Sequence, residues 1–116
     1  VKANIRLNPP TASSVDPVSV ALDMMMKSGP GAVVVVDEGR PVGVITERDI
    51  LDRVIRLRAD LNKILARDAM SSPIITIEED RSIQEALDLM RENNIRRLPV
   101  TRGGVLVGLT GGLVGR

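Results

Sequence analysis

An internal duplication is the feature that most limits what this chain can fold into. Residues 39–46 read Gly-Arg-Pro-Val-Gly-Val-Ile-Thr, and residues 104–110 read Gly-Val-Leu-Val-Gly-Leu-Thr. An apolar stretch that begins with Pro lies upstream of each, at residues 10–15 and 73–77. Matched residues lie 63 to 65 positions apart, which predicts a duplication with small insertions or deletions. A repeat of this length is too long for a solenoid unit and indicates two halves of one fold. The seam between such halves is a common place for a ligand cleft.

The first half predicts a strand, a helix and then two strands. Asp16 and Pro17 are typical of a helix start, with the acid as N-cap and Pro at the first helical position. The helix should end at residues 28–31, which read Ser-Gly-Pro-Gly, because Gly and Pro both interrupt helices. Residues 32–36 form an apolar, mostly β-branched run that is typical of a strand buried on both faces. Residues 42–46 should return as its hairpin partner.

Two further helices are expected between the halves. The first should run to about residue 58, because apolar residues recur there at helical spacing: Ile50, Leu51, Val54 and Ile55. The second should be formed by residues 59–70, which link the halves, and should dock through its apolar positions, Leu61, Ile64 and Leu65.

The second half repeats the order strand, helix, strand, strand and then stops. Six residues follow Thr110, and we expect no closing helix there. The predicted fold is therefore α/β, with two pseudo-symmetric repeats of which the second lacks its last helix. The first repeat, with its lead-in, should span residues 1–59, and the link and second repeat residues 60–116. Together they should form one compact module.

Aromatic residues, His and Cys are all absent from the chain, which limits its chemistry more than its fold. Val, Ile, Leu and Met can build a core without aromatic residues. Without His or Cys, however, the chain lacks the usual ligands of transition metals and a thiol nucleophile. It also lacks any side chain whose unperturbed pKa lies near neutrality. We therefore expect no enzyme, no catalytic residue, no metal site and no obligatory cofactor.

Charge and hydropathy exclude further classes of protein. The net charge of +1 is too balanced for a general nucleic-acid-binding surface. No apolar run approaches the roughly 20 residues that span a bilayer, and no signal peptide is visible. The absence of Cys is compatible with a reducing compartment. We expect a cytoplasmic protein that binds neither membrane nor nucleic acid.

Two ordered sets of motifs carry a resemblance to a known family. The first set comprises residues 34–37, 39, 42–46 and 48–51, and the second residues 70–71, 73, 86–90, 97–100 and 107–108. In this order and in duplicate, they resemble the tandem CBS-domain pair, also called a Bateman module, over roughly residues 10–113. The resemblance implies two repeats of the order strand, helix, strand, strand, helix.

Modules of this family are regulatory and bind adenosine-containing ligands in clefts between their two repeats. The resemblance therefore implies that this chain binds AMP, ADP or ATP, with S-adenosylmethionine as a further candidate. It also implies that binding is reported to a partner, such as a regulated enzyme or transporter. Family members commonly pair into a disc-like homodimer, so we expect a two-fold dimer.

The segment Thr46-Glu47-Arg48-Asp49 is the sharpest candidate for a ligand site. One carboxylate can accept hydrogen bonds from both hydroxyls of a ribose, and a helix start offers N–H groups and partial positive charge to a phosphate. The resemblance places Asp49 at the ribose and Thr46 beside the phosphate, with Arg48 between them in sequence. The same spacing is also that of a capping box, which needs no ligand. The two interpretations are compatible.

Arg96 and Arg97 precede Leu-Pro-Val and are the candidate phosphate ligands. In the regulatory subunit of AMP-activated protein kinase, a member of the family, a similar basic pair contacts the nucleotide phosphate. The resemblance implies that this pair reaches a ligand held by Asp49 from the other repeat. The planar fork of Arg suits phosphate, although two solvated side chains at a strand start are the alternative. The adenine would be lined by aliphatic residues that suit a core equally well: Val44, Ile45, Ile74 and Ile75.

The second cleft should not bind, because its matching residues differ. Ala32 and Val33 match the arginine pair, and the match to Asp49 falls on Gly or Leu within residues 110–113. We therefore expect one working site per chain, with weak phosphate binding by the Gly-rich backbone of the second cleft as the alternative. The degenerate second repeat also leaves an alternative function open, namely a structural homo-oligomerisation module whose site is vestigial.

Overall fold

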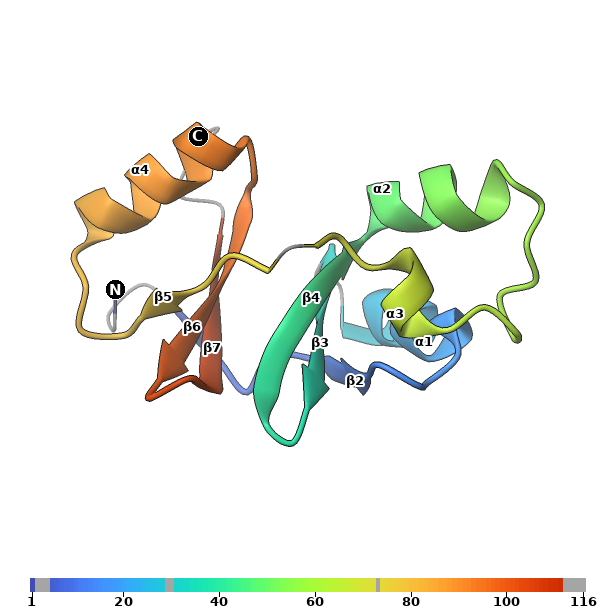
Figure 1. Ribbon diagram of the computed structural model, residues 1–116, viewed down its shortest axis with the longest axis horizontal. Coiled ribbons are helices and arrows are strands. Elements are labelled where there is room, and N and C mark those ends of the chain that lie inside the picture. The colour runs from blue at the N-terminus through green and yellow to red at the C-terminus, as the bar shows by residue number, and fades with distance from the viewer. Residues whose placement is uncertain (2–4, 29–30, 73, 112–116) are drawn as a thin grey trace. The chain divides into compact units, whose positions relative to one another are not determined.

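The computed structural model describes residues 1, 5–28, 31–72 and 74–111, which fold into two compact units (Figure 1). The amino-repeat unit comprises Pro10–Ile74, and the carboxyl-repeat unit comprises Val1–Pro9 together with Ile75–Arg116. The first residues of the chain therefore belong to the same compact unit as its second half. Both units combine strands with helices, so the predicted α/β class is confirmed.

The amino-repeat unit contains a three-stranded sheet in the order β2-β3-β4. Strand β2 (Thr11–Ser13) pairs in parallel with β3 (Ala32–Asp37), and β3 pairs antiparallel with β4 (Arg40–Thr46). Helix α1 (Val18–Ser28) connects β2 to β3. After β4 come helix α2 (Glu47–Ile50), its continuation as a π-helical turn, η2 (Leu51–Ile55), and the short helix α3 (Ala66–Ala69).

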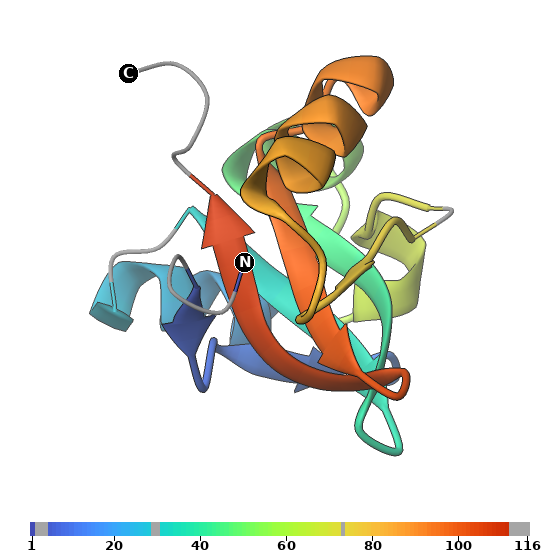
Figure 2. The ribbon, with the colours of Figure 1, turned by 90° about the vertical axis from the view of Figure 1, so that its left-hand side faces the viewer.

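The carboxyl-repeat unit contains a four-stranded sheet in the order β1-β7-β6-β5. Its elements are β1 (Arg6–Leu7), β5 (Ile77–Glu78), α4 (Ile83–Asn93), β6 (Arg97–Arg102) and β7 (Val105–Gly111). Strand β5 pairs in parallel with β6, whereas β7 pairs antiparallel with both β6 and β1. Figure 2 shows α4 lying across the face of this sheet.

Each unit has its own apolar core, and the two cores are built from matching positions. Ala21 and Met25 of α1 are buried against the first sheet, as Ala86 and Met90 of α4 are against the second. The β-branched run of β3 is buried from residue 32 to residue 35, as the sequence predicts. Burial of these aliphatic side chains supplies the main driving force for folding. None of the helices among the described residues is long and apolar enough to cross a membrane.

The hairpin turns of the two units are closed by backbone in the left-handed region. Glu38 and Gly39 have φ values of 53° and 78°, and Gly103 and Gly104 have values of 59° and 84°. Two successive residues with positive φ are typical of a type I′ turn, which suits the twist of a hairpin. The predicted hairpins at these places are confirmed.

The sheet registers correct our alignment of the two repeats. Gly43 lies opposite Val35 and Gly108 lies opposite Val100, so matching residues are 65 positions apart. Both hairpins also shift register directly after this pair, so the match needs no insertion or deletion. Thr110 therefore matches Ile45, and both side chains are fully buried.

This register also changes which residues of the second repeat correspond to the site residues of the first. The residue that corresponds to Thr46 is Gly111 and not Thr110. By the same register Arg97 corresponds to Ala32 and Arg96 to Gly31, so our match of the arginine pair to Ala32 and Val33 was wrong by one residue. The position that corresponds to Asp49, and the place where we expected no closing helix, lie beyond residue 111 and outside the described residues. The predicted helix end at residues 28–31 also falls partly on undescribed residues, although α1 does end at Ser28.

The predicted helix over residues 59–70 is wrong in extent, because only α3 (Ala66–Ala69) is helical there. Leu61 and Ile64 do pack against the core of the amino-repeat unit. Their carbonyl groups accept hydrogen bonds from the first N–H groups of α1: Ser19 donates to Leu61 at 2.9 Å and Val18 to Ile64 at 2.9 Å. The first residues of a helix have free N–H groups, so the segment serves α1 as a cap instead of forming a longer helix.

Candidate functional site

The start of α2 forms a reciprocal capping box between Thr46 and Asp49. The Thr46 N–H donates to Asp49 Oδ2 at 2.8 Å, and the Asp49 N–H donates to Thr46 Oγ1 at 3.3 Å. The Thr46 hydroxyl also donates to Asp49 Oδ2 at 3.1 Å. Thr46 has extended backbone, with φ −108° and ψ 169°, as an N-cap requires. The capping interpretation of this motif is thus confirmed.

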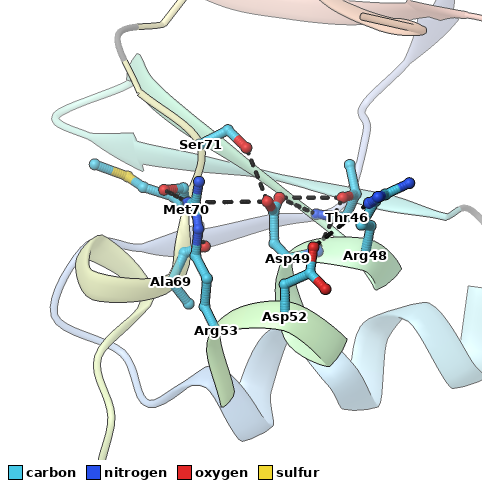
Figure 3. A network of polar contacts seen from close by, with 8 residues as sticks. All are labelled: Thr46, Arg48, Asp49, Asp52, Arg53, Ala69, Met70 and Ser71. Atoms are coloured by element: carbon cyan, nitrogen blue, oxygen red, sulfur yellow. Dashed lines mark hydrogen bonds and ion pairs between the residues drawn. The ribbon is translucent and has the colours of Figure 1, made fainter. Parts of the chain in front are cut away.

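The second carboxylate oxygen of Asp49 faces the segment that follows α3 (Figure 3). The Ser71 hydroxyl donates to Asp49 Oδ1 at 2.9 Å, and Arg53 Nη1 lies 3.8 Å from the same oxygen. Asp49 is only 7% exposed. A buried carboxylate must be hydrogen-bonded or paired to remain charged at low cost, and these contacts meet that need. Ser71 was not among the predicted site residues.

Arg53 ties η2 to the end of α3. Its Nη1 donates to the carbonyl oxygen of Ala69 at 3.1 Å and also to that of Met70. The last carbonyl groups of a helix lack partners within the helix, and a cation there also meets the negative end of the helix dipole. Arg53 therefore satisfies the end of α3 and places positive charge beside Asp49.

Strand β4 holds the same segment from the other side. The Ser71 N–H donates to the Val44 carbonyl at 2.9 Å, in an isolated antiparallel bridge. Next to it, Gly43 makes room for the Met70 side chain, since a Cβ atom on Gly43 would lie 2.3 Å from Met70 Sδ. The backbone at residues 70–71 is therefore fixed against β4 independently of the Ser71 hydroxyl.

The amino-repeat unit holds six of the nine predicted ligand residues. Val44 and Ile45 are buried in β4, Thr46 and Asp49 form the capping box, and Ile74 is half-buried at the end of the unit. Arg48 points away from this group, because its side chain is 88% exposed and its Nε lies 3.4 Å from Asp52 Oδ2.

The other three predicted residues, Ile75, Arg96 and Arg97, belong to the carboxyl-repeat unit. Arg97 opens β6 and is half-buried, whereas Arg96 is exposed. Arg97 Nη1 contacts the Arg96 carbonyl oxygen at 3.4 Å. Their proposed contact with a phosphate stays a prediction from the sequence.

A second polar cluster closes the hairpin of β6 and β7. Glu78 accepts hydrogen bonds from the Thr101 hydroxyl and from the N–H groups of Gly103 (2.8 Å) and Gly104 (3.4 Å). These donors, the Thr101 hydroxyl first, lower the pKa of Glu78 below its ordinary value. Beside it, Arg102 donates two hydrogen bonds to the Glu79 carboxylate, from Nε to Oε1 at 2.5 Å and from Nη2 to Oε2 at 3.1 Å. The cluster holds β5 to the hairpin and needs no ligand.

A groove between β5 and α4 is unsuited to a nucleotide. Its charged lining residues are mostly acidic: Glu78, Arg81, Glu85, Asp88 and Glu92. An excess of carboxylates repels a phosphate. Among the residues that the structure describes, no group of three or more metal-binding side chains is placed to hold an ion. The capping box and its surroundings therefore remain the candidate site.

Comparison with known proteins decides the family. The CBS domain model matches residues 3–56 and 66–109. The chain belongs to the CBS-domain family. The predicted tandem CBS pair is confirmed, because the family model matches two segments of the chain and the fold is mixed α/β.

Similar CBS proteins include relatives from archaea and bacteria. The uncharacterised protein MK0525 of Methanopyrus kandleri is 44% identical over 87 residues, which are 73% of this chain and 44% of that protein. A protein with CBS domains from Burkholderia ambifaria is 32% identical with a TM-score of 0.81, over 90% of this chain and 76% of that one. PAE2072 of Pyrobaculum aerophilum, solved in complex with AMP, is 30% identical with a TM-score of 0.80, over 91% of this chain and 81% of that one. This CBS chain covers 44%, 65% and 27% of three curated relatives, less than two thirds of each.

Proposed function

We propose that this CBS pair is a regulatory module that binds an adenosine nucleotide at Thr46 and Asp49 and signals its presence to a partner. The observation that carries the proposal is the pairing of these two side chains at the start of α2, directly after the buried strand β4. A CBS protein that is 30% identical was solved with AMP, which supports the ligand class. The carboxylate of Asp49 supplies acceptors for ribose hydroxyls.

The residue types around the site favour a nucleotide over other adenosine compounds. The half-buried aliphatic residues 74–75 would supply apolar surface to a base, and the chain has no aromatic side chain to stack on it. Specificity for adenine would then come from backbone N–H and C=O groups. Arg96 and Arg97 favour a ligand with phosphate, so AMP or ADP is proposed ahead of ATP and of the positively charged S-adenosylmethionine.

Thermal unfolding followed by far-UV circular dichroism tests this proposal, since the chain has no Trp for fluorescence. AMP, ADP, ATP and S-adenosylmethionine would each be added in excess. A ligand at 100 times its dissociation constant stabilises a protein by about 2.7 kcal/mol, which raises the unfolding midpoint by several degrees. A rise with AMP or ADP supports the proposal. No rise with any of the four compounds at millimolar concentration would contradict it.

A second candidate function is homo-oligomerisation with a vestigial site. Three large apolar side chains are exposed on and after η2: Leu51 at 58%, Ile55 at 50% and Leu57 at 65%. Leu51 and Ile55 are four residues apart in this helical segment and so lie on the same face, where together they present an apolar surface. A dimer in sedimentation equilibrium that is lost in Leu51→Lys/Ile55→Lys, with no nucleotide uptake, would favour this function. A monomer under the same conditions would count against it.

The proposed homodimer, the cytoplasmic location and the regulated enzyme or transporter remain predictions. They come from the resemblance of the sequence and from its composition. The function proposed for the chain is regulation without catalysis, and no residue is assigned a catalytic role.

A further inference from the structure

The hydrogen-bonding capacity of Asp49 bears directly on the proposed function, and the inference that follows rests on that function. A carboxylate offers about four acceptor positions, two on each oxygen. Oδ2 receives both the N–H and the hydroxyl of Thr46, at 2.8 and 3.1 Å. Oδ1 receives the Ser71 hydroxyl at 2.9 Å. Arg53 Nη1, at 3.8 Å, is close enough for an ion pair but too far for a hydrogen bond. With the described residues counted, one acceptor position therefore remains, whereas a ribose presents two hydroxyls.

The bonds to Asp49 differ in how readily they can be given up. The two hydrogen bonds from Thr46 belong to the capping box that begins α2, so their loss would destabilise the start of the helix. Ser71 is exposed, and its backbone is held separately by the hydrogen bond to the Val44 carbonyl at 2.9 Å. The Ser71 hydroxyl can therefore turn to water while the local backbone stays in place.

We propose that the Ser71 hydroxyl is an internal competitor of the nucleotide. It takes one acceptor position on Asp49 Oδ1 in the free protein, and one ribose hydroxyl takes that position in the complex. Ser71 is thus a positioning residue that sets the affinity of the site through Asp49. In both states the Asp49 charge keeps a hydrogen-bond donor, as a buried carboxylate requires.

The exchange also changes which contacts hold the segment that carries Ser71. Ser71 lies three residues before Ile74, where the amino-repeat unit ends. In the free protein the segment at residues 69–71 is held to Asp49 by its Ser71 side chain and to Arg53 by its carbonyl groups. Ligand binding removes the first of these restraints and leaves the second. Because the Ser71 N–H also stays bonded to the Val44 carbonyl, the ligand changes the side-chain contact of this segment and leaves its backbone in place.

Isothermal titration calorimetry with AMP, 2′-deoxy-AMP and 3′-deoxy-AMP tests the competition. The proteins are the unchanged chain, Ser71→Ala, Ser71→Thr and, as the matched control, Ser72→Ala at the neighbouring exposed serine. Ser71→Ala should bind AMP about threefold to tenfold more tightly, because a hydrogen bond to a charged group no longer has to be broken. The gain should vanish for the deoxy analogue that lacks the competing hydroxyl. Ser71→Thr should restore the original affinity, and Ser72→Ala should not change it.

Two results would overturn the inference and leave the proposed function standing. One is an affinity for AMP in Ser71→Ala that equals or falls below that of the unchanged chain. The other is a gain of the same size for AMP and both deoxy analogues, because a purely structural effect of the variant would not depend on a single hydroxyl. If the unchanged chain binds no AMP at millimolar concentration, the proposed function and this inference both fail.

Discussion

Thr46 and Asp49 each accept a hydrogen bond from the backbone N–H of the other, at 3.3 and 2.8 Å. The residue that we propose as the ribose ligand is thus also a structural residue of the free protein. Asp49→Ala should lower the free energy of unfolding by about 1–2 kcal/mol, the usual cost of losing a helix cap. Urea unfolding followed by circular dichroism measures this cost. An Asp49→Ala protein as stable as the original would show that the Asp49 side chain contributes nothing to the cap.

The contact between Gly43 and Met70 makes a second prediction about stability. A methyl group at residue 43 would lie 2.3 Å from Met70 Sδ, 2.7 Å from Cγ and 2.9 Å from Cβ, so Met70 must move. Gly43→Ala should therefore cost about 1–3 kcal/mol. The double variant Gly43→Ala/Met70→Ala should cost less than the sum of its two single variants, because the two closest contacts, with Sδ and Cγ, are then absent. Additive costs in urea unfolding would contradict the contact.

The lowered pKa of Glu78 predicts a dependence of stability on acid pH. The hydrogen bonds to Glu78 in the folded protein stabilise its charged form. Their contribution to the free energy of unfolding is therefore fully present above the unfolded pKa of Glu78, near 4.5. It is lost as the pH falls through the lower folded pKa. Glu78→Gln should therefore narrow the difference in stability between pH 7 and pH 3. Glu85→Gln, on exposed α4 surface, is the matched control. An unchanged pH profile in Glu78→Gln would contradict the prediction.

Substitution of Arg96 and Arg97 can separate recognition of the phosphate from recognition of the nucleoside. Arg96→Ala/Arg97→Ala should weaken AMP binding at least about tenfold, the usual effect of losing a hydrogen bond to a charged group. Binding of adenosine, which has no phosphate, should change little. Arg91→Ala, whose partner is Asp88 at 3.6 Å, is the control in the same unit. Equal losses for AMP and adenosine in calorimetry would remove the assigned role of the pair.

Local signals in the sequence explain why much of the fold was predictable. Gly39 and Gly104 mark hairpin turns that need positive φ, and the β-branched run at residues 32–36 marks a buried strand. Helix α1 begins and ends close to the predicted positions, because its start and stop signals lie within a few residues of its ends. The thirteen described residues of the link and α3 (59–71), in contrast, are held by contacts with α1, Asp49 and β4, which no local pattern encodes.

The candidate site was predictable only in part, for the same reason. Thr46 and Asp49 are three residues apart and form a recognisable motif, so sequence spacing reveals them. Ser71 is 22 residues from Asp49, and only the fold of the segment after α3 brings its hydroxyl to the carboxylate. Strand β1 likewise pairs with β7 although the first ten residues carry no strong pattern. The register of Thr110 was missed because Gly-Leu-Thr at residues 108–110 resembles Gly-Val-Ile-Thr at residues 43–46. The hydrogen-bonded ladder does not follow that match.

Calorimetric titration of AMP into Asp49→Asn and Asp52→Asn tests the central claim most directly. Asn at residue 49 keeps a hydrogen-bond acceptor for the cap but removes the charge and one of the two acceptor oxygens. Asp52 is the matched control, since it lies on the next turn and contacts the exposed Arg48. We predict that Asp52→Asn binds AMP as the unchanged chain does and that Asp49→Asn binds at least about tenfold more weakly. Equal AMP binding by both variants would contradict the assignment of Asp49 as the nucleotide ligand.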